Sequence, residues 1–262
     1  MNRRFFISKT FVFLFFSFIS TSNAQTWDLS IKGYLSGFKV GIASGKFSID
    51  KNKISLEIRA ETAGITSIFF PWEQQIKAIS DINKKSIISN FYRVDEIRDK
   101  TKKGHMELNF HNRIALVKSA EPPVINDTRR EPVDEQLKIN VLDPATAIIA
   151  IGYLTSISKN CDHKIPIFDG RRRFDLYTKE IGIENLTSSA FTDSHGESLK
   201  CKISIERIAG YSEKELKKHP RSGFVWLQKL PESELMMFPV KVQLPIGRAS
   251  FMTHLSVIYD KE

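Results

Sequence analysis

An alternation of apolar and polar residues with a period of two recurs along most of this chain and constrains its fold more than any other feature. The alternation is clearest over residues 27–34, 53–59 and 105–117. Neighbouring side chains on a β-strand point to opposite faces, so the pattern predicts strands with one apolar and one polar face. Such strands are typical of an antiparallel sheet that meets water on one side.

The same pattern predicts further strands, and turn-forming residues separate most of them. These strands are expected at residues 86–96, 165–176, 199–208, 224–228, 238–244 and 249–259. Glycines at positions 33, 37, 41 and 45 indicate tight bends or close backbone approach in the first strands. We therefore predict a mainly β protein, built as a strongly curved antiparallel sheet or a half-open β-barrel with one or two helices on its concave side.

The first predicted helix starts at residue 143. Asp143 suits the N-cap and Pro144 suits the first helical position. Its apolar face is predicted from a spacing of three residues, up to about residue 158: Ile148, Ile151, Leu154 and Ile157.

A weaker second helix is predicted over residues 62–80, interrupted by Pro71. It carries an apolar cluster that includes Ile65, Phe69 and Trp72. Together with the first helix, these side chains are candidates either to line an apolar cavity on the concave face or to plug it.

Residues 1–24 have the pattern of a cleavable signal peptide. Arg3 and Arg4 precede a short apolar run over residues 11–19, and the small residues Ser22 and Ala24 precede the expected cleavage point. An uncleaved anchor is the alternative. We expect export to the periplasm, one β-rich domain over residues 25–262, and no transmembrane segment after cleavage, since no other stretch is long and apolar enough.

Export affects the charge and the expected partners. Cleavage removes three basic residues, so the net charge falls from +9 to +6. A basic exported domain is suited to anionic lipid, an envelope polymer or an acidic partner protein, and nucleic acid is not expected as a partner. Alternatively, the excess of lysine serves only solubility.

Cys161 and Cys201 are the only two cysteines in the chain. An exported chain meets an oxidising compartment, so we predict one structural disulfide between neighbouring strands. Closing a loop of about 40 residues corresponds to roughly 4 kcal/mol of stabilisation. The alternative, a redox-active pair, usually has a shorter spacing on a helix start.

The most distinctive stretch is a turn at Asp169 and Gly170 followed by Arg171, Arg172 and Arg173. Guanidinium groups bind phosphate or carboxylate through paired hydrogen bonds, so the three arginines are a candidate anion or headgroup site. Strand alternation predicts that Arg172 points away from the other two. Structural pairing with nearby aspartates is the alternative.

We find no sequence motif of a known catalytic, metal or cofactor site, and we expect no enzyme activity, no metal and no cofactor. A hydrolase whose carboxylates come from distant strands is the least favoured alternative. The charged run over residues 214–221 is interpreted as a solvated loop, and the Pro-rich segment 121–135 as a mobile crossover or a partial domain boundary.

Several of these segments together resemble a known family. They are residues 142–147, Cys161, residues 168–176, and Cys201 with residues 209–211. The combination resembles DUF3108, an alphaproteobacterial periplasmic family of unknown function. The resemblance implies a curved, half-open antiparallel β structure shaped like the periplasmic lipoprotein carriers LolA and LolB, and it implies no mechanism.

Two functions are therefore expected from different classes. The favoured one is binding in the envelope, with a lipid, a lipoprotein or a partner protein in an apolar concavity and basic residues at its rim. The second is a structural or interaction protein that supports envelope integrity and holds no small ligand.

Overall fold

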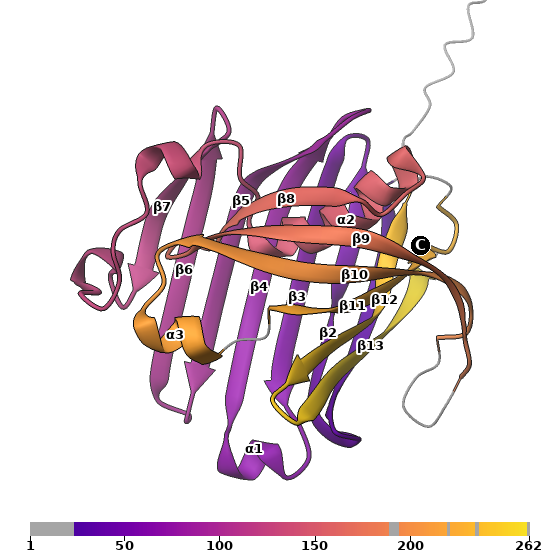
Figure 1. The fold of residues 1–262 in the computed structure, drawn as a ribbon, viewed down its shortest axis with the longest axis horizontal. Coiled ribbons are helices and arrows are strands. Elements are labelled where there is room, and N and C mark those ends of the chain that lie inside the picture. The colour runs from indigo at the N-terminus through magenta and orange to yellow at the C-terminus, as the bar shows by residue number, and fades with distance from the viewer. Residues whose placement is uncertain (1–23, 189–193, 219–220, 234–235, 261–262) are drawn as a thin grey trace, which may run out of the picture.

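One curved antiparallel sheet contains every strand of the described part of the chain. The computed structural model describes residues 24–188, 194–218, 221–233 and 236–260. Except for Ala24, the predicted signal peptide lies outside these residues. The described residues form thirteen strands, and their sheet curls until it nearly closes into a barrel (Figure 1). The mainly β prediction is confirmed.

The sheet consists of two meanders that meet at its centre. Strand β1 pairs with β2 on one side and with β13 on the other, so the spatial order is β7-β6-β5-β4-β3-β2-β1-β13-β12-β11-β10-β9-β8. The strands are β1 Gln25–Leu35, β2 Phe38–Asp50, β3 Lys53–Thr62, β4 Trp72–Ile82, β5 Ile87–Arg98, β6 Lys102–His111, β7 Ile114–Glu121, β8 His163–Phe168, β9 Arg173–Leu186, β10 Gly196–Ala209, β11 Ser222–Lys229, β12 Met237–Ile246 and β13 Ala249–Asp260.

A short connecting segment narrows the gap between the two edge strands, β7 and β8. Ile139 forms a bridge with Ile114 of β7, and Leu142 forms a bridge with Ile167 of β8. The backbone N–H of Leu142 donates to the carbonyl of Pro166 at 2.8 Å. Residues 139–142 therefore give both exposed edges hydrogen-bonding partners over a short length.

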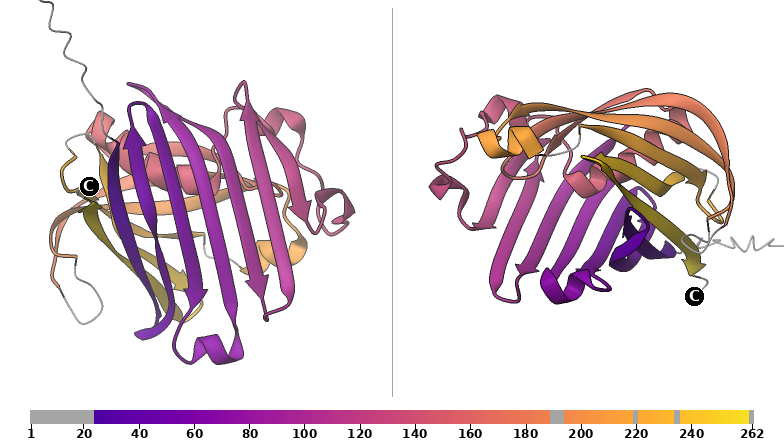
Figure 2. Two further views of the ribbon diagram at one scale, coloured as in Figure 1. Left: turned by 180° about the vertical axis from the view of Figure 1, so that it is seen from behind. Right: turned by 60° about the horizontal axis from the view of Figure 1, so that its bottom comes forward.

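The helix α2, Pro144–Ser158, lies between the two meanders on the concave side. Strands β8–β10 cross in front of β4–β6 with this helix between them (Figure 1), and the outer face of β1–β7 carries no helix (Figure 2). As predicted, Asp143 caps the helix, because its carboxylate accepts from the N–H groups of Ala145 and Thr146. Ser89 of β5 donates to the same carboxylate at 2.6 Å.

The buried face of α2 differs from the predicted one. Ile151 is buried and Leu154 is half-buried, but Ile148 and Ile157 are 49% and 41% exposed. Ile149 and Tyr153 are buried instead, together with several small residues, and Gly152 lies directly against the backbone of Met237 in β12. The close approach of Gly152 to the β12 backbone helps to decide which face of α2 is buried. The three-residue spacing of large apolar side chains does not reveal this approach.

The predicted helix over residues 62–80 is wrong. Only Thr66–Phe69 is helical, as the single turn α1, and Trp72–Ile82 forms strand β4. From Glu73 to Lys77 exposed and half-buried residues alternate, as a strand between β3 and β5 requires. Because α1 lies in the β3–β4 connection at one end of the barrel, it does not cover the concave side as the predicted helix would (Figure 1).

The predicted strand over residues 105–117 is two strands. Asn112 and Arg113 both adopt positive φ angles of 49° and 64° and form a tight hairpin turn between β6 and β7. Asparagine tolerates this conformation better than most residues, whereas arginine gives no such signal in the sequence.

The predicted disulfide is present. Cys161 and Cys201 are bonded, with their Cα atoms 6.3 Å apart, and both residues are fully buried. The bridge does not join neighbouring strands, because β9 lies between β8 and β10. It ties the chain that leaves α2 to β10, across the edge of the sheet.

Candidate functional site

The arginine turn connects β8 to β9 and is organised by the Asp169 side chain. Its carboxylate accepts from the backbone N–H groups of Arg171 and Arg172 at 2.9 and 2.7 Å, and from the Arg172 guanidinium at 2.7 Å. Gly170 adopts a φ of +94°, and a Cβ there would lie 2.3 Å from the Met106 sulfur. The Asp-Gly pair therefore fixes the turn against the inner face of β6.

The three arginines separate differently from the prediction. Arg171 and Arg172 belong to the turn and lie in one ion-pair cluster, whereas Arg173 is the first residue of β9. The Arg173 guanidinium is buried and donates to Asp175 at 2.6 Å and to the carbonyl of Leu137 at 3.1 Å. Strand alternation starts only at Arg173. Arg173, and not Arg172 as predicted, is therefore the arginine whose side chain has partners separate from those of the other two.

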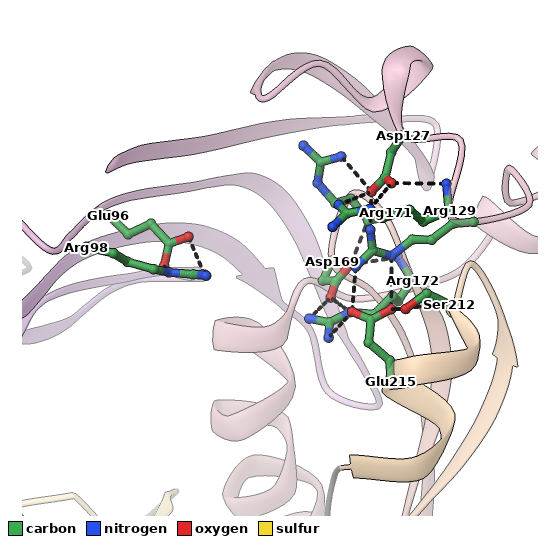
Figure 3. A network of polar contacts seen from close by, with 10 residues as sticks. Glu96, Arg98, Asp127, Arg129, Asp169, Arg171, Arg172, Ser212 and Glu215 are labelled. Carbon is green, nitrogen blue, oxygen red and sulfur yellow. Dashed lines mark hydrogen bonds and ion pairs between the residues drawn. The ribbon is translucent and has the colours of Figure 1, made fainter. Parts of the chain in front are cut away.

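Asp127 is the centre of the cluster around Arg171 and Arg172 (Figure 3). Its carboxylate is 5% exposed and forms ion pairs with Arg129 at 2.7 Å, with Arg130, and with Arg171 at 3.7 Å. The hydrogen bond from Arg129 contributes most to lowering the pKa of Asp127, which falls to about 2. Asp127 therefore keeps its charge at any physiological pH.

Glu215 holds the other side of the cluster from α3, Glu213–Lys218. It pairs with Arg130 at 2.5 Å and with Arg172 at 3.5 Å, and it accepts from the N–H and hydroxyl of Ser212 at 2.9 Å. Burial alone would raise the pKa of Glu215, but the hydrogen bonds from Arg130 and Ser212 lower it to about 2. The cluster thus joins the 121–135 connector, the arginine turn and α3.

Arg171 is the least satisfied arginine of this cluster. One guanidinium nitrogen donates to the carbonyl of Pro122, while Nη1 is buried without a hydrogen-bond partner in the described structure and lies 3.7 Å from Asp127. Burial lowers the pKa of Arg171, and its attraction to Asp127 only partly offsets that effect. A buried N–H donor without an acceptor is costly, so this nitrogen is suited to an added anionic oxygen.

A cavity of about 800 Å³ separates the cluster from the inner face of β4, β5 and β6. Its floor is apolar and is formed by side chains of the three strands: Ile76, Tyr92, Val94 and Met106. Its rim is mainly basic, with seven lysine and arginine residues against five aspartate and glutamate residues among those that line it. The cavity is therefore amphipathic, with a volume in the range of ordinary ligand sites.

Arg98, Lys102 and Lys103 supply the rim on the side of the β5–β6 turn. Arg98 pairs with Glu96 at 2.6 Å, and both lie across from the arginine cluster in Figure 3. A second, mostly apolar pocket of about 490 Å³ adjoins the cluster and shares Asp127, Arg130 and Arg171 with the cavity.

The residues predicted to line an apolar cavity do not come together. Ile65 and Phe69 lie in the exposed α1 connection, 69% and 66% exposed, and Trp72 starts β4 beside them. Ile148, Ile151 and Leu154 belong to α2, which packs against β4, β5, β8 and β12. The floor of the observed cavity comes instead from β4, β5 and β6, of which β5 and β6 were predicted as strands and β4 was not.

Sequence reasoning missed Asp127, Arg129, Arg130 and Glu215 as site residues. The connector that carries three of them was interpreted as mobile, and Glu215 was included in a solvated loop, of which residues 219 and 220 lie outside the described chain. A local signal for Glu215 existed, because Ser212 and Glu215 have the spacing of a helix capping box. The pairing of Asp127 with the turn has no local signal.

The described residues contain no group of three or more His, Cys, Asp or Glu side chains placed to hold a metal ion. Among the same residues, no helix has the length and apolar character of a membrane span.

The fold and site define a β-barrel-like protein with one internal helix and a charged cavity at its open side. A family model for proteins of unknown function, DUF3108, matches residues 26–255. The chain belongs to this family, as the resemblance in its sequence suggested.

One solved structure shows the same architecture. It is a crystal structure of a beta-barrel-like protein of domain of unknown function DUF1849 from Brucella abortus, with 11% identity and a TM-score of 0.51. The match covers 91% of this chain and 98% of that one, and at this identity it supports the fold alone. No curated protein matches the chain.

Proposed function

We propose that this chain is an exported, non-enzymatic binding protein of the periplasm whose ligand is an anionic amphiphile, such as a lipid with a negatively charged headgroup. One observation carries the proposal: the cavity of about 800 Å³ combines an apolar floor with a basic rim. Export is supported by the signal-like sequence of residues 1–24.

The two walls of the cavity suit the two halves of such a ligand. Ile76 and Val94 are only half-buried, so an acyl chain that covers them gains from the removal of apolar surface from water. On the opposite wall, the Nη1 of Arg171, which has no hydrogen-bond partner in the described structure, and the amine of Lys103 are donors for a phosphate or carboxylate. A ligand without charge would leave these donors unused.

The proposed binding site differs from the apolar concavity that was expected from the sequence. The concave side above the cavity is filled by α2, whose buried residues pack on the core of both meanders. Among the described residues, the cavity on the concave side therefore lies beside the charged cluster. A lipoprotein would enter through its acyl groups, with its polypeptide outside the barrel.

The test uses oleoyl-lysophosphatidylglycerol below its micelle concentration, so that no bilayer is present, with oleoyl-lysophosphatidylcholine as the neutral comparison. Calorimetry on the chain that begins at Gln25 should give binding of the anionic lipid and weaker binding of the neutral one. Val94→Gln on the floor and Lys103→Gln on the rim should each weaken binding about tenfold, whereas Arg59→Gln on the outer face should have no effect.

The proposal would be refuted if neither lipid bound, or if Val94→Gln bound the anionic lipid as tightly as the wild type does. Mass spectrometry of the protein purified from the periplasm of its own host, without detergent, should independently identify a co-purified anionic lipid.

A structural role is the second candidate, and the ion pairs favour it. Asp127, Asp169 and Glu215 already neutralise much of the arginine cluster and tie three separate segments together. On this alternative, Arg172→Gln lowers thermal stability while lipid binding is absent in wild type and variant alike.

A further inference from the structure

The end of the sheet that carries α1 exposes an unusual group of large apolar side chains, called here the apolar tip. It consists of Phe38, the first residue of β2, and of four residues in the β3–β4 connection: Ile65, Ile68, Phe69 and Phe70. Each of the five is between 66% and 76% exposed. A continuous exposed group of this size in a folded protein usually marks a contact surface.

The two segments of the apolar tip are joined to each other. The N–H of Ala63 donates to the carbonyl of Val40 at 3.0 Å, and the Thr66 hydroxyl donates to the same carbonyl at 2.9 Å. The start of β2 therefore lies beside α1, and Figure 1 shows both at the same end of the barrel. The tip is a fixed part of the fold, built on strand ends.

Basic residues surround the apolar tip. Lys39 follows Phe38 directly, and the β5–β6 turn lies on the other side, because the N–H of Asp99 donates to the carbonyl of Pro71 at 2.9 Å. That turn and the strand ends beside it contribute Arg98, Lys100, Lys102 and Lys103, all exposed. Arg98 pairs with Glu96 and Lys102 pairs with Asp99, which leaves Lys100 and Lys103 without an ion pair among the described residues. Net positive charge thus accompanies the exposed apolar residues.

We propose that the apolar tip docks on an anionic phospholipid bilayer, with its Phe and Ile side chains among the acyl chains and the surrounding lysines at the headgroups. The shape supports a bilayer, because a projecting strand end can enter a fluid surface and needs no matching groove. The charge supports an anionic one, since basic residues beside inserted apolar residues strengthen binding to acidic lipid. Trp72, half-buried directly after Pro71, has the amphipathic character of an interfacial residue.

Docking in this way brings the cavity to the membrane surface. Arg98, Lys102 and Lys103 border both the apolar tip and the cavity, so a lipid could pass between bilayer and cavity over a short distance. The docking inference stands on the tip alone and does not require that the cavity binds a ligand.

The test is flotation of the chain that begins at Gln25, which contains every described strand and helix, with vesicles of phosphatidylglycerol and phosphatidylcholine in equal amounts. We expect association that weakens in high salt and is lost with pure phosphatidylcholine. The double variant Ile68→Asn/Phe69→Ser should reduce partitioning at least about a hundredfold, at about tenfold for each side chain. Lys100→Gln/Lys103→Gln should reduce it about 25-fold, at roughly fivefold for each lysine.

Matched controls exist elsewhere on the surface. Ile183→Asn and Ile258→Asn change residues that are 67% and 66% exposed outside the tip, and Lys84→Gln/Lys85→Gln removes two exposed lysines from the β4–β5 turn at the other end of the sheet. All should partition like wild type. The cavity variant Val94→Gln should also float normally, which separates failure of the docking inference from failure of the proposed ligand site.

A second measurement uses the unaltered tip. Brominated phosphatidylglycerol vesicles should quench part of the tryptophan fluorescence, and Trp72→Phe should remove that quenching, because Trp27 and Trp226 are buried. Wild-type protein that does not float, tip variants that float like wild type, or equal flotation with neutral vesicles would each overturn the inference. Concentration-dependent dimers that the tip variant abolishes, without vesicle association, would instead assign the tip to a second copy of the chain.

Discussion

Gly152→Ala tests how closely α2 is seated against the sheet. A Cβ at position 152 would lie 1.9 Å from the carbonyl oxygen of Met237 and 2.7 Å from its carbonyl carbon. Both atoms belong to the backbone of β12, so no flexible side chain can move aside. A normal contact requires a separation of about 3.5 Å, and either α2 or β12 must therefore shift by more than 1 Å.

Opposing effects decide the size of the change. Alanine favours a helix over glycine by about 1 kcal/mol. Overpacking against a fixed backbone costs about 1–3 kcal/mol, and occasionally more. The shift also strains the hydrogen bond from the Met237 N–H to the Ser156 hydroxyl, 2.7 Å long, whose loss costs about 1 kcal/mol. We expect a net destabilisation of about 1–3 kcal/mol.

Thermal unfolding followed by circular dichroism measures this change. For a chain of this length, about 2–4 °C per kcal/mol gives a fall in Tm of about 2–12 °C. Gly33→Ala in β1 is the matched control, because its Cβ would meet the Phe251 ring at an ordinary 3.5 Å and its Tm should stay equal or rise. If Gly152→Ala raised the Tm as much as Gly33→Ala, the close seating of α2 would be refuted.

Two further predictions concern charges. Arg173→Gln removes one of the two cationic partners of Asp175 and leaves Lys164, 2.9 Å away, so it should lower the free energy of unfolding by about 1.5–3 kcal/mol. Arg93→Gln, in an exposed pair, should change the free energy of unfolding by about 0–1 kcal/mol. Urea denaturation compares the two variants, and equal effects would contradict the burial of Arg173. The pKa values of Asp127 and Glu215 are about 2 in the folded protein, below their ordinary values of 3.8 and 4.5. The stability that these two carboxylates contribute is therefore present above about pH 4.5 and is lost as the pH falls toward 2. Asp127→Asn should reduce the fall in stability at low pH, which the urea midpoints at pH 7, 4.5 and 2.5 measure. A fall in stability equal to that of the wild type would contradict the role of Asp127 in the ion-pair cluster.

The sequence predicted those features that depend on local backbone geometry. Alternation located most strands, since the side chains of a strand necessarily point to alternate faces. Asp143 and Pro144 located the start of α2 because capping needs only the neighbouring N–H groups. The disulfide between Cys161 and Cys201 followed from the expected compartment and the absence of any third cysteine.

Strand β4 shows where local pattern was insufficient. The apolar cluster before it is compatible with a helix, but β3 and β5 supply hydrogen-bonding partners on both edges of Trp72–Ile82. Those partners are residues of other strands, so pairing in the sheet outweighs the weak helical preference of the segment. The same competition left Ile68 and Phe69 exposed on a single turn of helix.

The candidate site was decided almost entirely by tertiary structure. The sequence predicted strands at β5 and β6, but it predicted a helix where β4 lies, and it did not indicate that the arginine turn would lie opposite these strands. Arg130 and Glu215 are 85 residues apart in the chain, and Arg171 meets Asp127 across a long connection. An ion pair requires only that two charges come close in space, so its partners leave no periodic pattern in the sequence. The sequence by itself therefore determined the strands, the helix cap and the disulfide, while the closure of the barrel decided which charges meet and where a ligand has room.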